Sequence, residues 1–307
     1  YNRSPMSRTN PQGYLLHPKY WPVWLGFGVL RLLSFLPYPA LMASGRALGR
    51  LARRLAGRRA DIARINLELC FPELDATAID KLVTRHFESV GMGVMEFAMA
   101  WWWPNRRLEH LLEIEGKENM KPAFEAGKGV IFFSAHMSSI EISGRFLSWY
   151  ANAMPMYRPN ENPVIERVMV SNRENHIEKA IPREDVRLML KTLRANKGVW
   201  FAPDQNYGHK HSVFADFFGI PAATNTSASR FCEMTGARLV PFVVLRKPGG
   251  GYRMIVEPAL EDFPSDPQDD ATRLNAIVER WSREAPEQYN WMHRRFKDRP
   301  GDEPRFY

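Results

Sequence analysis

The spacing of apolar residues predicts helices at the start of the chain. Residues 20–36 are almost wholly apolar; Pro22 suits a first helical turn, and Pro37 suits the end of a helix. A helix over 23–36 would be about 21 Å long at 1.5 Å per residue. Because a bilayer core needs about 20 helical residues, the pattern favours a helix that lies in the membrane interface, with a buried core helix as the alternative.

A second, strongly basic helical pattern covers residues 46–64. It holds seven arginines against one acid, Asp61, and leucines and isoleucines interleave them at near-helical spacing. A basic amphipathic helix beside an apolar segment is typical of binding to an anionic membrane leaflet. A solvated helix face is the alternative, and the lack of a recognition motif argues against DNA binding.

From residue 75 onward the pattern predicts an α/β fold. A helix is expected over 75–100, and continuous apolar runs are typical of strands buried on both faces. Such runs cover 130–135, 198–204 and 237–246, and "NAMPMYRP" predicts a further short strand ending at Arg158. Helical patterns cover 140–150, 164–176, 185–196 and 267–281. Glycines 249–251 predict a hairpin into "YRMIVEPAL". We therefore expect a mixed, mostly parallel central sheet flanked by helices, with an antiparallel edge and a membrane-associated N-terminal helix.

The chain is long enough for one large core. It has 307 residues, of which 45% are hydrophobic, and it shows no internal repeat and no linker. The expected organisation is a polar leader over 1–19, a membrane anchor with the basic amphipathic helix over 20–64, and a catalytic domain over 65–307.

Charge and cysteine content narrow the partners. A net charge of +8 predicts an anionic partner, which could be a nucleic acid, an anionic lipid surface or an acidic protein. The two cysteines, Cys70 and Cys232, lie far apart, so neither a disulfide framework nor a metal framework follows. A reducing compartment fits this usage best.

Several common chemistries lack their motifs. There is no G-x-S-x-G elbow, no phosphate-binding Walker loop and no G-x-G-x-x-G after a strand. His209 and His211 have no carboxylate or cysteine at ligand spacing, so with Lys210 they favour a basic phosphate-binding loop over a metal site. We expect no metal and no cofactor.

His136 and Asp204 stand out by their position. His136 follows the predicted strand over 130–135, and Asp204 ends the run over 198–204. Ligands of open α/β sheets gather outside the carboxyl ends of the strands, so both side chains should reach one rim. At neutral pH an imidazole can take a proton from a hydroxyl.

Glu141 is a candidate partner for His136. A carboxylate beside the second ring nitrogen would fix the tautomer and stabilise the imidazolium. Five positions on one helix are about 140° apart, so the two could meet only if His136 precedes the helix. However, "SSIE" also fits a capping box of Ser138 and Glu141, and both interpretations stay open.

At this point the chain resembles a known family. His136-x-x-x-x-Glu141 resembles the H-x-x-x-x-D/E motif of the glycerolipid acyltransferase superfamily. Further stretches resemble the late acyltransferases of lipid A biosynthesis, the lauroyl/myristoyl transferase family, in order over about residues 20–300. These stretches are "INLELCFPEL", "YRP", "PDQNYG", "FFGIPAAT", "LVPFVV" and "PEQYNWMHRRFKDRP".

The resemblance implies transfer of a fatty acyl chain from acyl carrier protein to the hydroxyl of an acyl chain on a lipid A precursor. The enzyme would work at the cytoplasmic face of the Gram-negative inner membrane, with the membrane surface as a partner and without nucleic acid. His136 would be the base and Glu141 its partner. Substrate-binding roles are implied for four residues, Arg158, Arg173, Asp204 and Gln205.

One departure affects acyl-chain choice. The family usually has glycine before the histidine and tryptophan before the acid, where this chain has Ala135 and Ile140. We expect direct transfer in a ternary complex, because no serine or cysteine has an activating environment. The alternatives are an acyl-coenzyme A enzyme acting on another glycolipid such as a mannosylated phosphoinositide, a thioesterase, and a non-catalytic lipid-binding protein.

Overall fold

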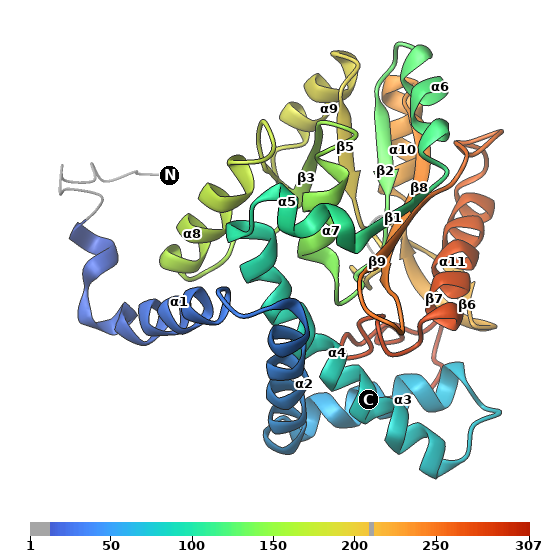
Figure 1. The fold of residues 1–307 in the computed structure, drawn as a ribbon. Helices are drawn as coiled ribbons and strands as arrows, with labels where there is room; N and C mark the ends of the chain where they lie inside the picture. Colours follow the sequence, from blue (N-terminus) through green and yellow to red (C-terminus); the bar gives the residue numbers. More distant parts are fainter. Residues whose placement is uncertain (1–12, 209–211) are drawn as a thin grey trace, which may run out of the picture.

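The computed structural model describes residues 13–208 and 212–307, and its centre is a seven-stranded sheet in the order β1-β9-β8-β2-β5-β3-β4 (Figure 1). The strands are β1 (Leu112–Glu115), β2 (Val130–Phe133), β3 (Ala153–Tyr157), β4 (Ile181–Pro182), β5 (Gly198–Phe201), β8 (Arg238–Arg246) and β9 (Tyr252–Val256). Five of them, β8, β2, β5, β3 and β4, run parallel. The predicted mixed, mostly parallel sheet is confirmed.

The antiparallel part of the sheet differs from the prediction in one respect. β9 pairs antiparallel with β8 through the predicted hairpin, but β1 then pairs parallel with β9 and covers it. β9 is therefore one strand in from the edge. A separate hairpin of β6 (Ser212–Phe217) and β7 (Ile220–Asn225) was not predicted, and it packs on the last helix.

Helices cover both faces of the sheet. The helices of the described residues are α1 (Trp21–Leu33), α2 (Tyr38–Leu55), α3 (Gly57–Cys70), α4 (Ala76–Trp102), α5 (Asn105–Leu108), α6 (Met120–Glu125), α7 (Ile140–Leu147), α8 (Pro163–Glu174), α9 (Val186–Arg194), α10 (Ser227–Thr235) and α11 (Pro267–Glu284), of which α1 to α3 lie beyond the end of the sheet. In the described part of the chain there are also four 3₁₀ turns, Gly13–Leu16, Pro18–Tyr20, Glu109–Leu111 and Lys117–Asn119.

The basic segment 46–64 is two helices rather than the single one predicted. Ala56, with φ −103° and ψ 46°, ends α2 and precedes α3. The α2 helix packs closely along α4, because glycines at the crossing, Gly45, Gly49 and Gly91, leave no room for a Cβ. The two halves of the arginine-rich segment therefore present different faces.

Two hydrophobic cores lie on opposite faces of the sheet. Successive side chains of a strand point to opposite faces, so Phe133 joins one core with α11 and Phe132 joins the other with α7. All four residues of β2 are buried, as the continuous apolar run predicted. This burial places the carboxyl end of β2 in the middle of the molecule.

The N-terminal helix α1 packs one side against the core through Phe27, Leu30 and Leu33 and leaves the apolar side chains of its other side exposed. It has no buried residue, and Leu25 and Leu32 are each 70% exposed. It extends beside α8 at the margin of the sheet. Within the two described ranges, every helix falls short of the length or the apolar character that a membrane crossing requires.

Candidate functional site

His136 and Asp204 meet because their strands are paired in register. β2 and β5 run parallel with Phe133 opposite Phe201, and each polar residue stands three positions beyond that pair. The ring Nδ1 of His136 lies 2.6 Å from Asp204 Oδ1, and the backbone N–H of His136 donates to Asp204 Oδ2 at 3.1 Å. The prediction that both reach one rim of the sheet is confirmed.

The two groups shift each other's ionisation. Burial lowers the pKa of His136, but the charge of Asp204 and the hydrogen bond outweigh it, so the net pKa is raised. Burial likewise raises the pKa of Asp204, and the interaction with His136 lowers it by more. Asp204 is therefore a carboxylate that accepts a hydrogen bond from Nδ1–H, which leaves Nε2 as the acceptor in the neutral ring.

Glu141 is not paired with His136, which corrects the expected partnership. Its carboxylate accepts hydrogen bonds from Trp101 Nε1 at 2.7 Å and from Arg173 Nε and Nη2 at 3.0 and 2.6 Å. Trp101 lies in the last turn of α4 and Arg173 lies in α8. Neither contact is visible in local sequence spacing, because both partners come from remote helices.

The capping-box interpretation is also wrong. Ser139, not Ser138, is the residue before α7, and its side chain does not cap the helix. Ser138 Oγ instead lies 2.6 Å from Ser89 Oγ and accepts from Arg246 Nη1 at 3.0 Å. The turn between β2 and α7 is therefore held by α4 and β8 rather than by its own helix.

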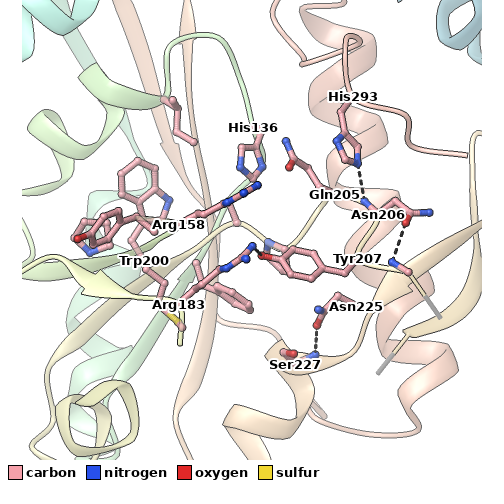
Figure 2. Close-up of a pocket in the computed structure, with 18 of the residues that line it drawn as sticks. His136, Arg158, Arg183, Trp200, Gln205, Asn206, Tyr207, Asn225, Ser227 and His293 are labelled. Carbon is pink, nitrogen blue, oxygen red and sulfur yellow. Dashed lines mark hydrogen bonds between the residues drawn. The ribbon is translucent and has the colours of Figure 1, made fainter. Parts of the chain in front are cut away.

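A cavity of about 1490 Å³ opens in front of His136. Figure 2 shows His136, Gln205 and Arg158 around this space, with Trp200 on the side of Arg158. The site residues Arg158, Arg173 and Gln205 line the cavity with His136, whereas Asp204 lies beneath the ring. One stretch of wall near His136 is apolar and is made by Ile140, Pro155, Met156, Met169 and Trp200.

The rest of the cavity wall is strongly basic. Seven arginines and lysines line it against one acid, Glu184. The cations are Arg58, Arg59, Arg158, Arg173, Arg183, Arg294 and Lys297. They come from α3, from the segments after β3 and β4, from α8 and from the C-terminal segment, so only the fold collects them. An anionic ligand would be favoured here.

Several lining residues were missed by sequence reasoning. His293 Nε2 accepts from the backbone N–H of Asn206 at 3.0 Å, and Arg183 donates to the hydroxyl of Tyr207 at 2.9 Å (Figure 2). Burial lowers the pKa of His293 to about 4, so its ring is neutral and can accept this bond. Both Asn206 and His293 belong to motif stretches, but no spacing rule links them.

The remaining candidate groups fall outside this chemistry. Both cysteines are buried, and burial raises the pKa of each thiol, that of Cys232 to about 12. Neither is therefore a thiolate at neutral pH. The H-x-H pair, His209 and His211, lies outside the described residues.

Known proteins resemble this chain over most of its length. The family model described as bacterial lipid A biosynthesis acyltransferase matches residues 9–298. The lipid A biosynthesis lauroyltransferase of Escherichia coli K12 is 42% identical over 95% of this chain and 97% of the relative. The palmitoleoyltransferase of the same strain is 40% identical over 95% and 96%. The crystal structure of the 1-acyl-sn-glycerophosphate acyltransferase PlsC from Thermotoga maritima aligns with a TM-score of 0.39 at 12% identity, covering 74% of this chain and 97% of that one.

Proposed function

Because the chain belongs to the bacterial lipid A biosynthesis acyltransferase family, and is therefore an acyltransferase, we propose that it takes its acyl chain from acyl carrier protein. The acceptor is the hydroxyl of an acyl chain already on a lipid A precursor. The observation that carries the proposal is the His136 ring, backed by Asp204 and facing a cavity with apolar and basic walls.

His136 acts as the general base. Its Nε2 takes the proton of the acceptor hydroxyl while the hydroxyl oxygen attacks the thioester carbonyl. The C–S bond then breaks, and the departing thiolate takes the proton back from the imidazolium. Asp204 holds the ring and stabilises its charged form, which is the role first expected of Glu141. No covalent acyl-enzyme is needed.

Glu141 is a positioning residue, which acts through Arg173. It is 6% exposed and holds the guanidinium of Arg173 through two hydrogen bonds. Arg173 lines the cavity, and its remaining N–H groups are candidate donors to the oxyanion that forms on the thioester carbonyl. Arg158 and Gln205 line the same cavity and are assigned to substrate binding.

The charge and the N-terminal surface support these substrates. Planar guanidinium groups bind phosphate in a bidentate manner, and an acidic carrier protein is attracted by a basic rim. The exposed apolar side chains of α1 suit a membrane interface. We therefore place the enzyme at the cytoplasmic face of the inner membrane, where such an acceptor would be presented.

The test is transfer by the purified protein, followed by mass spectrometry of the glycolipid. Acyl carrier protein and coenzyme A thioesters are compared as donors, with lipid A precursor as acceptor. Transfer from the carrier protein, lost in His136→Ala at an unchanged melting temperature, is the expected result. A preference for acyl-coenzyme A would contradict the proposed donor. Release of fatty acid without a glycolipid product would indicate a thioesterase. Normal lipid A in cells carrying His136→Ala would indicate a non-catalytic role.

A single-turnover experiment tests the direct transfer. Acyl chain trapped on the protein after rapid quenching would contradict the ternary-complex mechanism. The length of the acyl chain is a separate question, because the two relatives described above are named for lauroyl and palmitoleoyl chains at nearly equal identity.

A further inference from the structure

A second, much smaller cavity lies behind the apolar wall of the site. Its volume is about 30 Å³, roughly the share of one water molecule in the liquid. It is lined by residues of α7, α8, the end of α4 and the strands β3 and β5. Three residues, Pro155, Arg173 and Trp200, line both this cavity and the large one, so they form the partition between them.

Trp200 is the largest side chain of this partition. It leaves β5 on the α7 side of the sheet and is 9% exposed. Its ring lies over Gly144 of α7, where an added Cβ would stand 2.8 Å from Cζ3 of the indole. The indole nitrogen is buried without a hydrogen-bond partner among the described residues. Packing alone therefore holds the ring in place.

The surroundings of the small cavity suit an apolar chain end. The carboxylate of Glu141 and the guanidinium of Arg173 pair with each other, and the guanidinium of Arg145, which also lines the cavity, donates to Asn105. Burial lowers the pKa of His176, which leaves that ring neutral. Ala100, Ala153, Pro155 and Ile177 supply apolar wall. A chain that runs from a thioester at His136 along Ile140 and Met169 would meet the indole at its far end.

We propose that Trp200, seated on Gly144, sets the length of the fatty acyl chain, and that the small cavity behind it is the unused extension of the acyl site. The inference rests on the proposed acyl transfer and adds the pair of residues that limits the length of the acyl chain. Each methylene that fits buries apolar area and changes affinity about fourfold, whereas each one that does not fit must displace the indole.

Two substitutions shift the preference in opposite directions. Trp200→Leu removes most of the partition and joins the cavities, so the ratio of kcat/KM for 16-carbon over 12-carbon donors should rise by about tenfold or more. Gly144→Ala places a methyl group under the ring and pushes it toward the large cavity. The same ratio should then fall by a similar factor.

A matched control is Trp149→Ala. Trp149 lies two residues beyond the end of α7, but it lines a separate surface pocket with Asn105, Glu109 and Tyr150 and lines neither cavity of the site. It should lower the melting temperature without changing the ratio. If the substitutions acted only through lost packing, and not through the length of the acyl site, all three variants would have the same effect on the kcat/KM ratio.

Binding of non-hydrolysable acyl-pantetheine thioethers of increasing acyl-chain length gives a second measurement that does not depend on transfer. Calorimetric affinities from 10 to 16 carbons should show the same opposite shifts in length optimum for Trp200→Leu and Gly144→Ala. Trp200→Phe, a milder change, serves if Trp200→Leu does not fold. An unchanged length optimum in both folded variants overturns the proposal, whereas opposite shifts in thioether binding without transfer to lipid A precursor would refute only the proposed acceptor.

Discussion

Two buried polar clusters hold the same turn, two residues apart, and only one of them opens to the outside. His136 and Asp204 form the first, and the histidine side chain is 34% exposed to the large cavity. Ser138 belongs to the second, in which Arg246 pairs with Glu96 at 2.5 and 2.8 Å. The side chains of Arg246 and Glu96 are 7% and 0% exposed.

In the second cluster, which is closed to solvent, other protein groups supply the hydrogen-bond partners. Arg246 also donates to Ser89 Oγ at 2.6 Å, and the hydroxyl of Tyr252 donates to Glu96 at 2.8 Å. Burial raises the pKa of Tyr252 well above its usual value, so the hydroxyl keeps its proton. In the open cluster, by contrast, Asp204 occupies Nδ1 of His136 and the other ring nitrogen is left for a substrate. The difference indicates that one cluster serves chemistry and the other holds the turn in place.

The largest expected effect lies in the open cluster. Asp204→Asn keeps the size of the side chain but removes the carboxylate that fixes the tautomer of His136. We expect kcat to fall by about 10²–10⁴-fold, with little change in melting temperature. Steady-state kinetics and thermal unfolding measured on one preparation separate the two quantities. A variant that unfolds early but turns over normally would reverse the assigned roles.

A substitution in the closed cluster should lower stability. Arg246→Met leaves the Glu96 carboxylate buried without its charge partner, so the free energy of unfolding should fall by about 3–5 kcal/mol in urea titrations. The double variant Arg246→Met with Glu96→Leu removes both charges and should recover most of that loss. If the single variant were as stable as the native protein, the cluster would not be holding the turn.

The pH profile sharpens the comparison further. Asp204 favours the protonated imidazolium and raises the pKa of His136, and the base must be neutral to work. The acid limb of kcat/KM should therefore lie above the usual range for histidine. In Asp204→Asn burial dominates, and the limb should move to lower pH.

Glu184→Gln is the control for this shift. Glu184 is the one acid among the residues that line the large cavity, and its carboxylate pairs with Arg183 instead of His136. Its removal should leave the acid limb in place. Equal shifts in both variants would mean that general charge, rather than the hydrogen bond, sets the pKa of His136.

The smallest effect on folding is expected at a surface outside both clusters. Leu51 and Leu55 on α2 are 52% and 78% exposed. Replacing both with serine should change the free energy of unfolding by less than about 0.5 kcal/mol per site. Binding to anionic vesicles, measured by co-sedimentation, should weaken. Unchanged vesicle binding would contradict the predicted role of residues 46–64 in binding an anionic leaflet.

Sequence patterns predicted the strands that are buried on both faces. The continuous apolar runs identified β2, β5 and β8, because a strand covered on both faces has no polar period. The short strands β1 and β4 and the β6–β7 hairpin were missed. The residues of β1 alternate between half-buried and exposed, and β4 has two residues, so their apolar signal is weak. Gly57, directly after Ala56, marks the break between α2 and α3, but the regular spacing of arginines and leucines across it favoured one continuous helix.

The sequence by itself determined that His136 and Asp204 stand at the carboxyl ends of buried strands, since hydrophobic periodicity and chain order are local properties. Which carboxylate reaches the imidazole was decided only in three dimensions. The register of β2 and β5 brings Asp204 to the ring, while Trp101 and Arg173 take Glu141 away. A hydrogen bond depends on the direction of side chains from elements tens of residues apart, and spacing along one helix carries no such information.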